Sequence, residues 1–134
     1  MLRALSLRDF VIVEALDLEL ATGFTALTGE TGAGKSILVD ALGLVLGARA
    51  DPGVIRAGAA RTDIAAEFEV AALPAARAWL AASDLDEEGG ETCLVRRTID
   101  RAGRSRGFVN GRPATAAQLR ELGEHLVDIH GQHE

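Results

Sequence analysis

The scarcest functional residue type in this chain of 134 residues is lysine: Lys35 is the only one, and every other basic side chain except histidine is arginine. A GTPase reads guanine with an Asn-Lys-x-Asp motif, and the surroundings of this single lysine exclude that class. One cysteine, Cys93, excludes an internal disulfide and is typical of a reducing compartment. The N-terminus lacks the apolar stretch of a secretory signal, and no apolar run is long enough to cross a membrane. We therefore expect a soluble, cytoplasmic protein without a membrane partner.

Aromatic residues make up only 4% of the chain, yet 48% of it is apolar, which is enough for a packed core of Leu, Val and Ile. The formal net charge of -6 argues against a basic protein that coats nucleic acid. That average conceals two neighbouring clusters of opposite charge. The acidic cluster is Asp84, Asp86, Glu87, Glu88 and Glu91, and the arginine cluster is Arg96, Arg97, Arg101, Arg104, Arg106 and Arg112.

The length is that of one modest domain or of a piece of a larger one, and apolar periodicity predicts the strands and helices of an α/β fold. The first two strands are expected to pair through the short connection at 9–14, and two later strands to form a hairpin around Ala102-Gly103. The strands are predicted at 2–7, 16–20, 24–28, 64–70, 93–99, 105–109 and 126–129, and the helices at 35–46, 75–82 and 115–122.

Turn and capping signals mark the ends of these elements. Gly47 is placed to end the first helix, and Thr115 with Gln118 has the spacing of a capping box at the start of the last one. Asn110-Gly111 indicates a further turn. The segment 49–62, rich in Gly, Ala and Arg, is expected to be a loop.

A phosphate-binding motif lies between the predicted strand at 24–28 and the helix at 35–46, and it matches the pattern G-x-x-x-x-G-K-[ST] at every position. Its glycines let backbone N–H groups approach phosphate oxygens, and the helix that follows directs the positive end of its dipole to the same anion. Lys35 is expected to contact the β- and γ-phosphates, and Ser36 to bind Mg²⁺. The motif, which predicts a nucleotide site, is Gly29, Glu30, Thr31, Gly32, Ala33, Gly34, Lys35 and Ser36.

Further segments, in order along the whole chain, resemble the ABC-type ATPase heads of the structural-maintenance-of-chromosomes (SMC) kind, and in particular the RecN family of bacterial DNA-repair proteins. The motif, read from Leu27 to Ser36, has the RecN form. The segment from Gly103 to Gly111 is similar to the G-x-S-x-x-[FY]-[IV]-N-G stretch of these heads. The sequence departs from the pattern of these heads at Asp9, a position where they often carry asparagine. The other matching segments are Asp9 to Ile12, Ser36 to Leu42, Leu46-Gly47, Arg96-Arg97 and Asp128 to Glu134.

The resemblance implies a P-loop NTPase fold: the N-terminal lobe of an ABC-type head, with antiparallel β hairpins flanking a strand–P-loop–helix unit. It implies ATP with Mg²⁺ as ligand, Lys35 and Gln132 as catalytic residues, and Ser36 with Gln132 near the metal, where Gln132 senses the γ-phosphate. It further implies a nucleoid-associated protein that acts in DNA double-strand-break repair and recombination, in which ATP clamps two heads together on DNA.

Several parts of a working site of this kind are missing from the sequence, namely an apolar strand ending in Asp-Glu (Walker B), a signature motif, a switch histidine and a coiled coil. We therefore expect residues 1–134 to be an incomplete head that needs the C-terminal half of the same head and has no ATPase activity alone. The alternatives left open are a stand-alone nucleotide-binding or regulatory module without turnover, an ABC transporter subunit and a small-molecule kinase.

The arginine cluster supports two interpretations: a contact with DNA phosphates, whose affinity depends on salt, or a solvated face balanced by the acidic cluster beside it. Arg49 and Arg56 are further candidates for contacts with the phosphates of nucleotide or DNA. His130 and His133 have a spacing found in metal sites, but no cysteine or carboxylate set completes one, so no structural metal is predicted.

Overall fold

The computed structural model describes residues 2–19, 32–49, 51–87 and 90–126, with the backbone alone at 32–35. No helix in these ranges is long and apolar enough to span a membrane. The described residues form an α/β fold, as the periodicity predicts, with one sheet and three α-helices among them. The strands are β1 Leu2–Phe10, β2 Val13–Glu19, β3 Arg61–Glu69, β4 Thr92–Asp100, β5 Ser105–Val109 and β6 Arg112–Ala114; the helices are α1 Gly32–Val45, α2 Pro74–Ala82 and α3 Ala116–Leu126, with a short 3₁₀ turn, η2, at Pro52–Val54.

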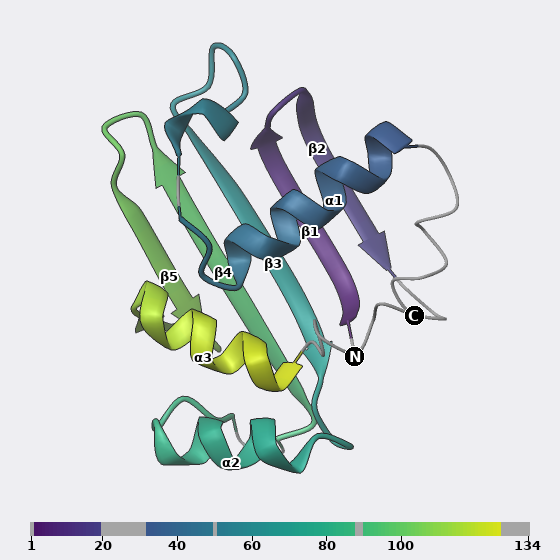
Figure 1. The fold of residues 1–134 in the computed structure, drawn as a ribbon, viewed down its shortest axis with the longest axis vertical. Helices are drawn as coiled ribbons and strands as arrows, with labels where there is room; N and C mark the ends of the chain where they lie inside the picture. Colours follow the sequence, from purple (N-terminus) through teal and green to yellow (C-terminus); the bar gives the residue numbers. More distant parts are fainter. Residues whose placement is uncertain (1, 20–31, 50, 88–89, 127–134) are drawn as a thin grey trace.

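The described strands make one antiparallel sheet in the order β2-β1-β3-β4-β5-β6 (Figure 1). Both predicted hairpins are confirmed, because β1 pairs with β2 and β4 pairs with β5. Between the hairpins lies β3, which pairs with β1 on one side and with β4 on the other. The segment that carries the phosphate-binding motif and α1 connects β2 to β3 in the sequence. Because β2 and β3 both belong to the sheet, the sheet holds both ends of this segment.

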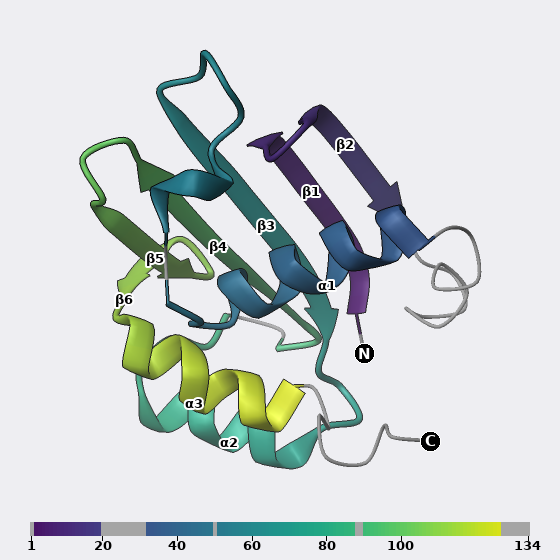
Figure 2. The ribbon, with the colours of Figure 1, turned by 45° about the horizontal axis from the view of Figure 1, so that its top comes forward.

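Side chains alternate across the sheet and give it one apolar face. In β3, Ile64, Ala66 and Phe68 are all buried. The register places Ile64 opposite Leu7 of β1, and Ala66 opposite Val95 of β4, so the buried positions of neighbouring strands coincide. Helix α1 crosses this face, and α3 lies beside it over β5 (Figures 1 and 2). The core therefore fills the space between the sheet and these two helices.

Helix α2 packs against α3 near one end of the sheet (Figure 2). Its first residue is Pro74, as expected, because proline lacks the N–H that a first helical turn leaves unpaired. Trp79 Nε1 on α2 donates a hydrogen bond to Glu121 Oε1 on α3 at 3.0 Å. The two helices thus pack together as a pair, and α3 contacts the sheet at β5.

The predicted caps are confirmed. Gly47 has φ 101°, a left-handed conformation that suits glycine, and its N–H donates to the carbonyl of Leu44 at 3.1 Å. At the start of α3, the N–H of Gln118 donates to Thr115 Oγ1 at 3.0 Å, and the N–H of Thr115 donates to Gln118 Oε1 at 2.9 Å. This reciprocal pair is a complete capping box.

Most element boundaries differ from the sequence predictions by one to four residues, and the differences at α1 and α3 bear on the site. Helix α1 begins at Gly32 rather than at residue 35. The first helical turn is not marked by the apolar pattern, which starts only at Ile37, and its N–H groups need no partner within the helix. Helix α3 continues past Leu122 to Leu126, so the strand predicted from Leu126 is wrong at that residue. Leu122 and Leu126 are both buried and lie on one face of the helix. Their spacing of four residues is helical, but the apolar residues that follow Leu126 in the sequence resemble a short strand. The other residues of that predicted strand, and the predicted strand at 24–28, lie outside the described residues.

Two short elements, β6 and η2, were not predicted from the sequence. Pro113 sits in the short strand β6, at the end of the sheet order, where proline is tolerated because its missing N–H interrupts no ladder. Within the predicted loop at 49–62, the carboxylate of Asp51 accepts a hydrogen bond from the N–H of Gly53 at 2.9 Å and starts η2. Both elements are only three residues long, so neither shows the periodic apolar pattern from which strands and helices are predicted.

Candidate nucleotide-binding site

The phosphate-binding motif joins the described structure at the N-terminal end of α1. The helix begins at Gly32, inside the motif, so the backbone from there to Ser36 is already helical. Ser36 is exposed. The helix thus starts three residues before the predicted residue 35, and the loop that precedes it lies outside the described residues. Ala33, Gly34 and Lys35 contribute their backbone to the first turns of α1, whereas Gly29, Glu30, Thr31 and Gln132 lie outside the described residues.

The N-terminal end of α1 suits an anion. Its first turn contains no acidic residue, so no carboxylate of that turn competes for the unpaired backbone N–H groups. A helix of 14 residues also has a substantial dipole, whose positive end is the end that carries the motif. The described part of the site therefore fits the phosphates of a nucleotide.

Two arginines bind the carbonyl groups at the opposite end of α1. Arg97 Nη1 donates to the carbonyl of Leu44 at 2.6 Å and also to that of Ala48. Arg120 Nη1 donates to the carbonyl of Gly47 at 3.0 Å. Because the last carbonyls of a helix carry the negative end of its dipole, both cations are favourably placed. The C-terminal end of α1 is thus held by β4 through Arg97 and by α3 through Arg120.

Arg97 is a buried charge with an exposed fraction of only 3%. Its Nε donates to Ser105 Oγ on β5 at 2.8 Å, and it takes part in none of the ion pairs formed among the residues that the structure describes. Burial lowers the pKa of Arg97, and the nearby positive charge of Arg120 lowers that pKa further. The guanidinium is compensated by carbonyl and hydroxyl dipoles in place of a carboxylate.

The structural role of Arg97 was missed in the sequence, although a signal for it exists. Cys93, Val95 and Ile99 of β4 are buried and two or four residues away from Arg97. Strand alternation places residues at these spacings on the same face of the sheet. An arginine in phase with buried positions must therefore find hydrogen-bond acceptors inside the protein.

Other members of the arginine cluster contact acidic residues of the sheet. Arg96 Nη2 lies 2.8 Å from Asp63 Oδ1, and its guanidinium carbon is 5.7 Å from the centre of the Phe108 ring. Arg104 pairs with Asp100 at 3.0 Å. The balancing charges for these two arginines come from Asp63 and Asp100, and not from the acidic cluster proposed in the sequence analysis.

Arg106 differs from these two arginines, because it is exposed and its side chain has no hydrogen-bond or ion-pair partner among the described residues, while its backbone lies opposite Thr98 in the β4–β5 ladder. A contact between the arginine cluster and DNA stays a prediction, for which Arg106 is an exposed side chain that no contact within the described residues engages.

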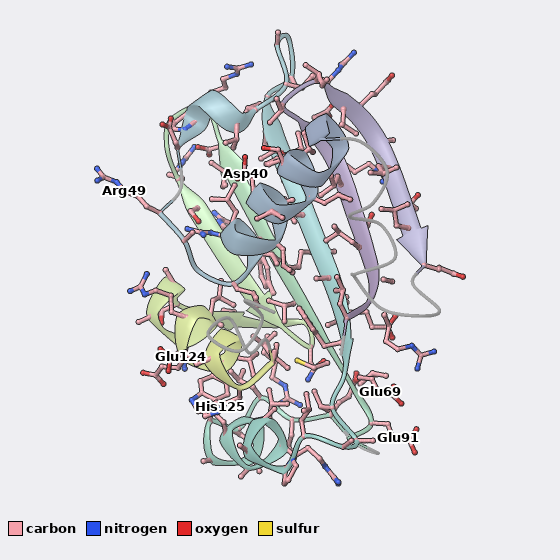
Figure 3. The ribbon with its side chains drawn as sticks, turned by 45° about the vertical axis from the view of Figure 1, so that its right-hand side comes forward. Asp40, Arg49, Glu69, Glu91, Glu124 and His125 are labelled. Carbon is pink, nitrogen blue, oxygen red and sulfur yellow. The ribbon has the colours of Figure 1, made fainter. Side chains whose placement is uncertain are left out.

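Arg49 and Arg56, the other candidates for phosphate contacts, are placed differently. Arg49 follows the C-terminal end of α1 and projects outward (Figure 3). The motif is at the other end of this helix, about 20 Å away for 14 residues. Arg56 Nη1 lies 3.6 Å from Asp9 Oδ1. Within one chain, Arg49 is thus remote from the motif.

Comparison with known proteins places the chain among ATPase heads. A family model described as an AAA domain matches residues 4–129. The DNA repair protein RecN of Xylella fastidiosa strain Temecula1 is 48% identical over 134 residues, which cover 100% of this chain and 24% of that protein. RecN of Vibrio cholerae is 47% identical over 133 residues, or 99% of this chain and 24% of the relative. The chain spans about a quarter of the length of these relatives.

The solved structures agree with this result. A structure from work on ATP-driven dimerization and DNA-stimulated activation of SMC ATPases superposes with a TM-score of 0.71 and 26% sequence identity, covering 92% of this chain and 78% of that one. The expected fold class, an α/β P-loop NTPase of the ATPase-head type, is confirmed. The chain belongs to the AAA-domain family, and within it resembles, over its full length, the N-terminal part of the DNA repair protein RecN.

Proposed function

We propose that this chain is the ATP-binding N-terminal segment of a RecN-like ATPase that acts in DNA double-strand-break repair and recombination. The observation that carries the proposal is the phosphate-binding motif, which runs into the first turn of α1 in a chain 48% identical to a RecN. The similarity to RecN extends along the whole chain, and it favours a repair ATPase over a transporter subunit, a kinase or a stand-alone regulatory module.

The roles of the site residues follow from their chemistry. Backbone N–H groups from Gly29 to Ser36 bind the phosphates, and the ammonium of Lys35 places a point charge beside the β- and γ-phosphates. The hydroxyl of Ser36 and the side-chain oxygen of Gln132 are suitable ligands for Mg²⁺, which prefers oxygen. ATP with Mg²⁺ supplies the phosphoanhydride that the full-length protein hydrolyses.

A single chain of this kind is expected to bind nucleotide without turning it over. The sequence has no apolar strand ending in Asp-Glu and no signature motif, so it lacks the groups that polarise water and complete the site across a dimer. We propose that the C-terminal half of the same head and a second head supply them. The SMC relative is described as dimerising in an ATP-driven way with DNA-stimulated activation, which supports a head-to-head dimer and DNA as partners of the full-length protein.

Calorimetric titration of the 134-residue chain with Mg²⁺-ATP tests the proposal. We expect saturable binding, and we expect Lys35→Ala to weaken it by roughly tenfold or more, because the lysine ammonium is the one lysine charge available to the phosphates. Mg²⁺-GTP serves as the base-specificity control.

Arg3→Ala is the matched control, since Arg3 is a half-exposed cation on β1 that pairs with Glu69 at 3.7 Å and lies in no predicted site. Its ATP affinity should equal that of the wild type. A folded wild-type chain that binds no ATP, or a Lys35→Ala variant that binds as well as the wild type, would contradict the proposed site.

A further inference from the structure

The C-terminal end of α1 meets α3 at a contact that only glycine permits. A Cβ atom added at Gly47 would stand 2.5 Å from Arg120 Cγ and 2.7 Å from the carbonyl oxygen of Ala116. The backbone of Gly47 therefore lies directly against the first turns of α3. Arg120 uses this proximity, because its Nη1 donates to the carbonyl of that same glycine at 3.0 Å.

A second close contact lies one turn further along α3. Gly123 is buried, and a Cβ atom added there would lie 3.1 Å from the Cβ of Leu46, the residue that follows α1. That distance is tighter than ordinary van der Waals contact, so an alanine would require Leu46 to shift by a few tenths of an ångström. Since interiors are close-packed, the separation of α1 and α3 is set by Gly47 and Gly123 together.

The sheet holds the same end of α1 from the other side. The guanidinium of Arg97 reaches from β4 to the carbonyls of Leu44 and Ala48, and Ser105 on β5 fixes its Nε at 2.8 Å. A lysine in this position has no fork of donors in one plane and cannot reproduce these bonds. Three elements, β4, β5 and α3, thus fix the C-terminal end of the helix whose other end carries the motif.

We propose that Arg97 and Arg120 are positioning residues of the nucleotide site, which hold the C-terminal end of α1 and thereby set where its N-terminal end meets the phosphates. The inference rests on the proposed ATP site. An α-helix is stiff over 14 residues, so a shift at one end is transmitted to the other. Phosphate contacts depend on the placement of backbone N–H groups, and small displacements of such groups weaken binding and slow reaction.

The test uses the full-length ATPase that carries this sequence. The measurements are the dissociation constant of a non-hydrolysable ATP analogue with Mg²⁺, by calorimetry, and the melting temperature without nucleotide. A residue that only stabilises the fold lowers the melting temperature, while the molecules that stay folded bind nucleotide with unchanged affinity. A positioning residue changes the dissociation constant of the folded molecules.

Arg120→Ala is expected to raise the dissociation constant about tenfold, and Arg120→Lys to restore part of the affinity because one donor can still reach the Gly47 carbonyl. Arg97→Lys is expected to raise it as well. Gly123→Ala provides a variant with little risk of unfolding: alanine favours the helix, which offsets the crowding of Leu46, so its melting temperature should hold while its dissociation constant rises. Arg3→Ala is again the control.

Dissociation constants within twofold of the wild type for both Arg120→Ala and Gly123→Ala would overturn the inference. The proposed function fails in a different way, through a wild-type protein that binds no ATP or a Lys35→Ala variant that binds normally. Raised dissociation constants in both variants, with the melting temperature of Gly123→Ala unchanged, would establish that the contact of α1 with α3 positions the site.

Discussion

At the scale of single residues, Cys93 shows how strongly burial alters chemistry. It lies on the apolar face of β4 and has no exposed surface. Burial raises the pKa of the Cys93 thiol from 9.0 to about 12, and the negative charge of Glu87 contributes to the increase. The thiolate is the reactive form of cysteine, so the folded chain keeps this side chain in its unreactive state at neutral pH.

We predict that Cys93 reacts with a thiol-specific reagent at pH 8 only when the chain unfolds. The reaction should be slower in the native state by about two orders of magnitude or more, because both access and ionisation are suppressed there. A time course with Ellman's reagent, with and without urea, measures the difference. Rapid and complete reaction of the native chain would contradict the buried position of this residue.

The raised pKa of Cys93 also predicts how stability depends on pH. The unfolded chain ionises the thiol near pH 9 and the folded chain near pH 12, so the native state holds more protons between these values. The contribution of Cys93 is therefore fully present below pH 9 and is lost as pH rises toward 12. The chain has no tyrosine and one lysine, so few other groups titrate there. The urea midpoint should fall across this range, and fall less in Cys93→Ala.

At the scale of elements, the stability of α3 depends on the capping box in its first turn. The capping box joins Thr115 and Gln118 by two hydrogen bonds of 3.0 and 2.9 Å, which satisfy two backbone N–H groups that the helix leaves unpaired. Because α3 carries both Arg120 and the contacts with α2, loss of its first turn would loosen one side of the core.

Replacing Thr115 with alanine should lower the free energy of unfolding by about 1 kcal/mol, the usual loss for a removed N-cap hydroxyl. Urea denaturation followed by circular dichroism measures this change. Thr115→Ser keeps the hydroxyl and should retain most of the stability. If both substitutions were equally destabilising, the methyl group of Thr115 would matter and the cap would not.

The elements also show what sequence patterns can and cannot predict. The hairpin around Ala102-Gly103, the Gly47 cap and the capping box depend on residues close in sequence, and all three were predictable. The position of β3 between β1 and β4 depends on pairing between distant segments, which no local period encodes. The contacts of Arg97 could not be predicted for the same reason, since its partners Leu44 and Ala48 are distant from it in the sequence. The phosphate motif was evident because its chemistry is local, whereas the residues that hold its helix are not.

For the whole molecule, the distribution of apolar surface predicts association. Val39 on α1 has an exposed fraction of 46%, and Leu42, three residues further along and so a neighbour on the helix surface, is only half-buried. Ile12, in the turn between β1 and β2, is 78% exposed. Apolar side chains gathered on one helix are a more effective contact surface than a single exposed one.

We therefore expect the 134-residue chain to self-associate as its concentration rises, and Val39→Glu to suppress association more than Ile12→Lys does. Sedimentation velocity over a range of concentrations measures both effects. Both positions are exposed, so neither variant should lose its fold, which circular dichroism can verify. A wild-type chain that stays monomeric at high concentration would contradict the prediction.

The order of the strands has a consequence for the route by which the chain folds. The hairpins of β1 with β2 and of β4 with β5 close over short stretches of sequence, and the pairing of β3 with β4 spans the longer segment that contains α2. The pairing of β1 with β3 spans the longest segment, because it must bring Arg8 to Asp63 across the residues that contain α1. Closing a long loop is the slow event in folding, because its entropy is lost before the contacts form. The phosphate-binding motif lies inside that loop. The capacity to bind nucleotide should therefore appear at the end of refolding, after the hairpins are already present.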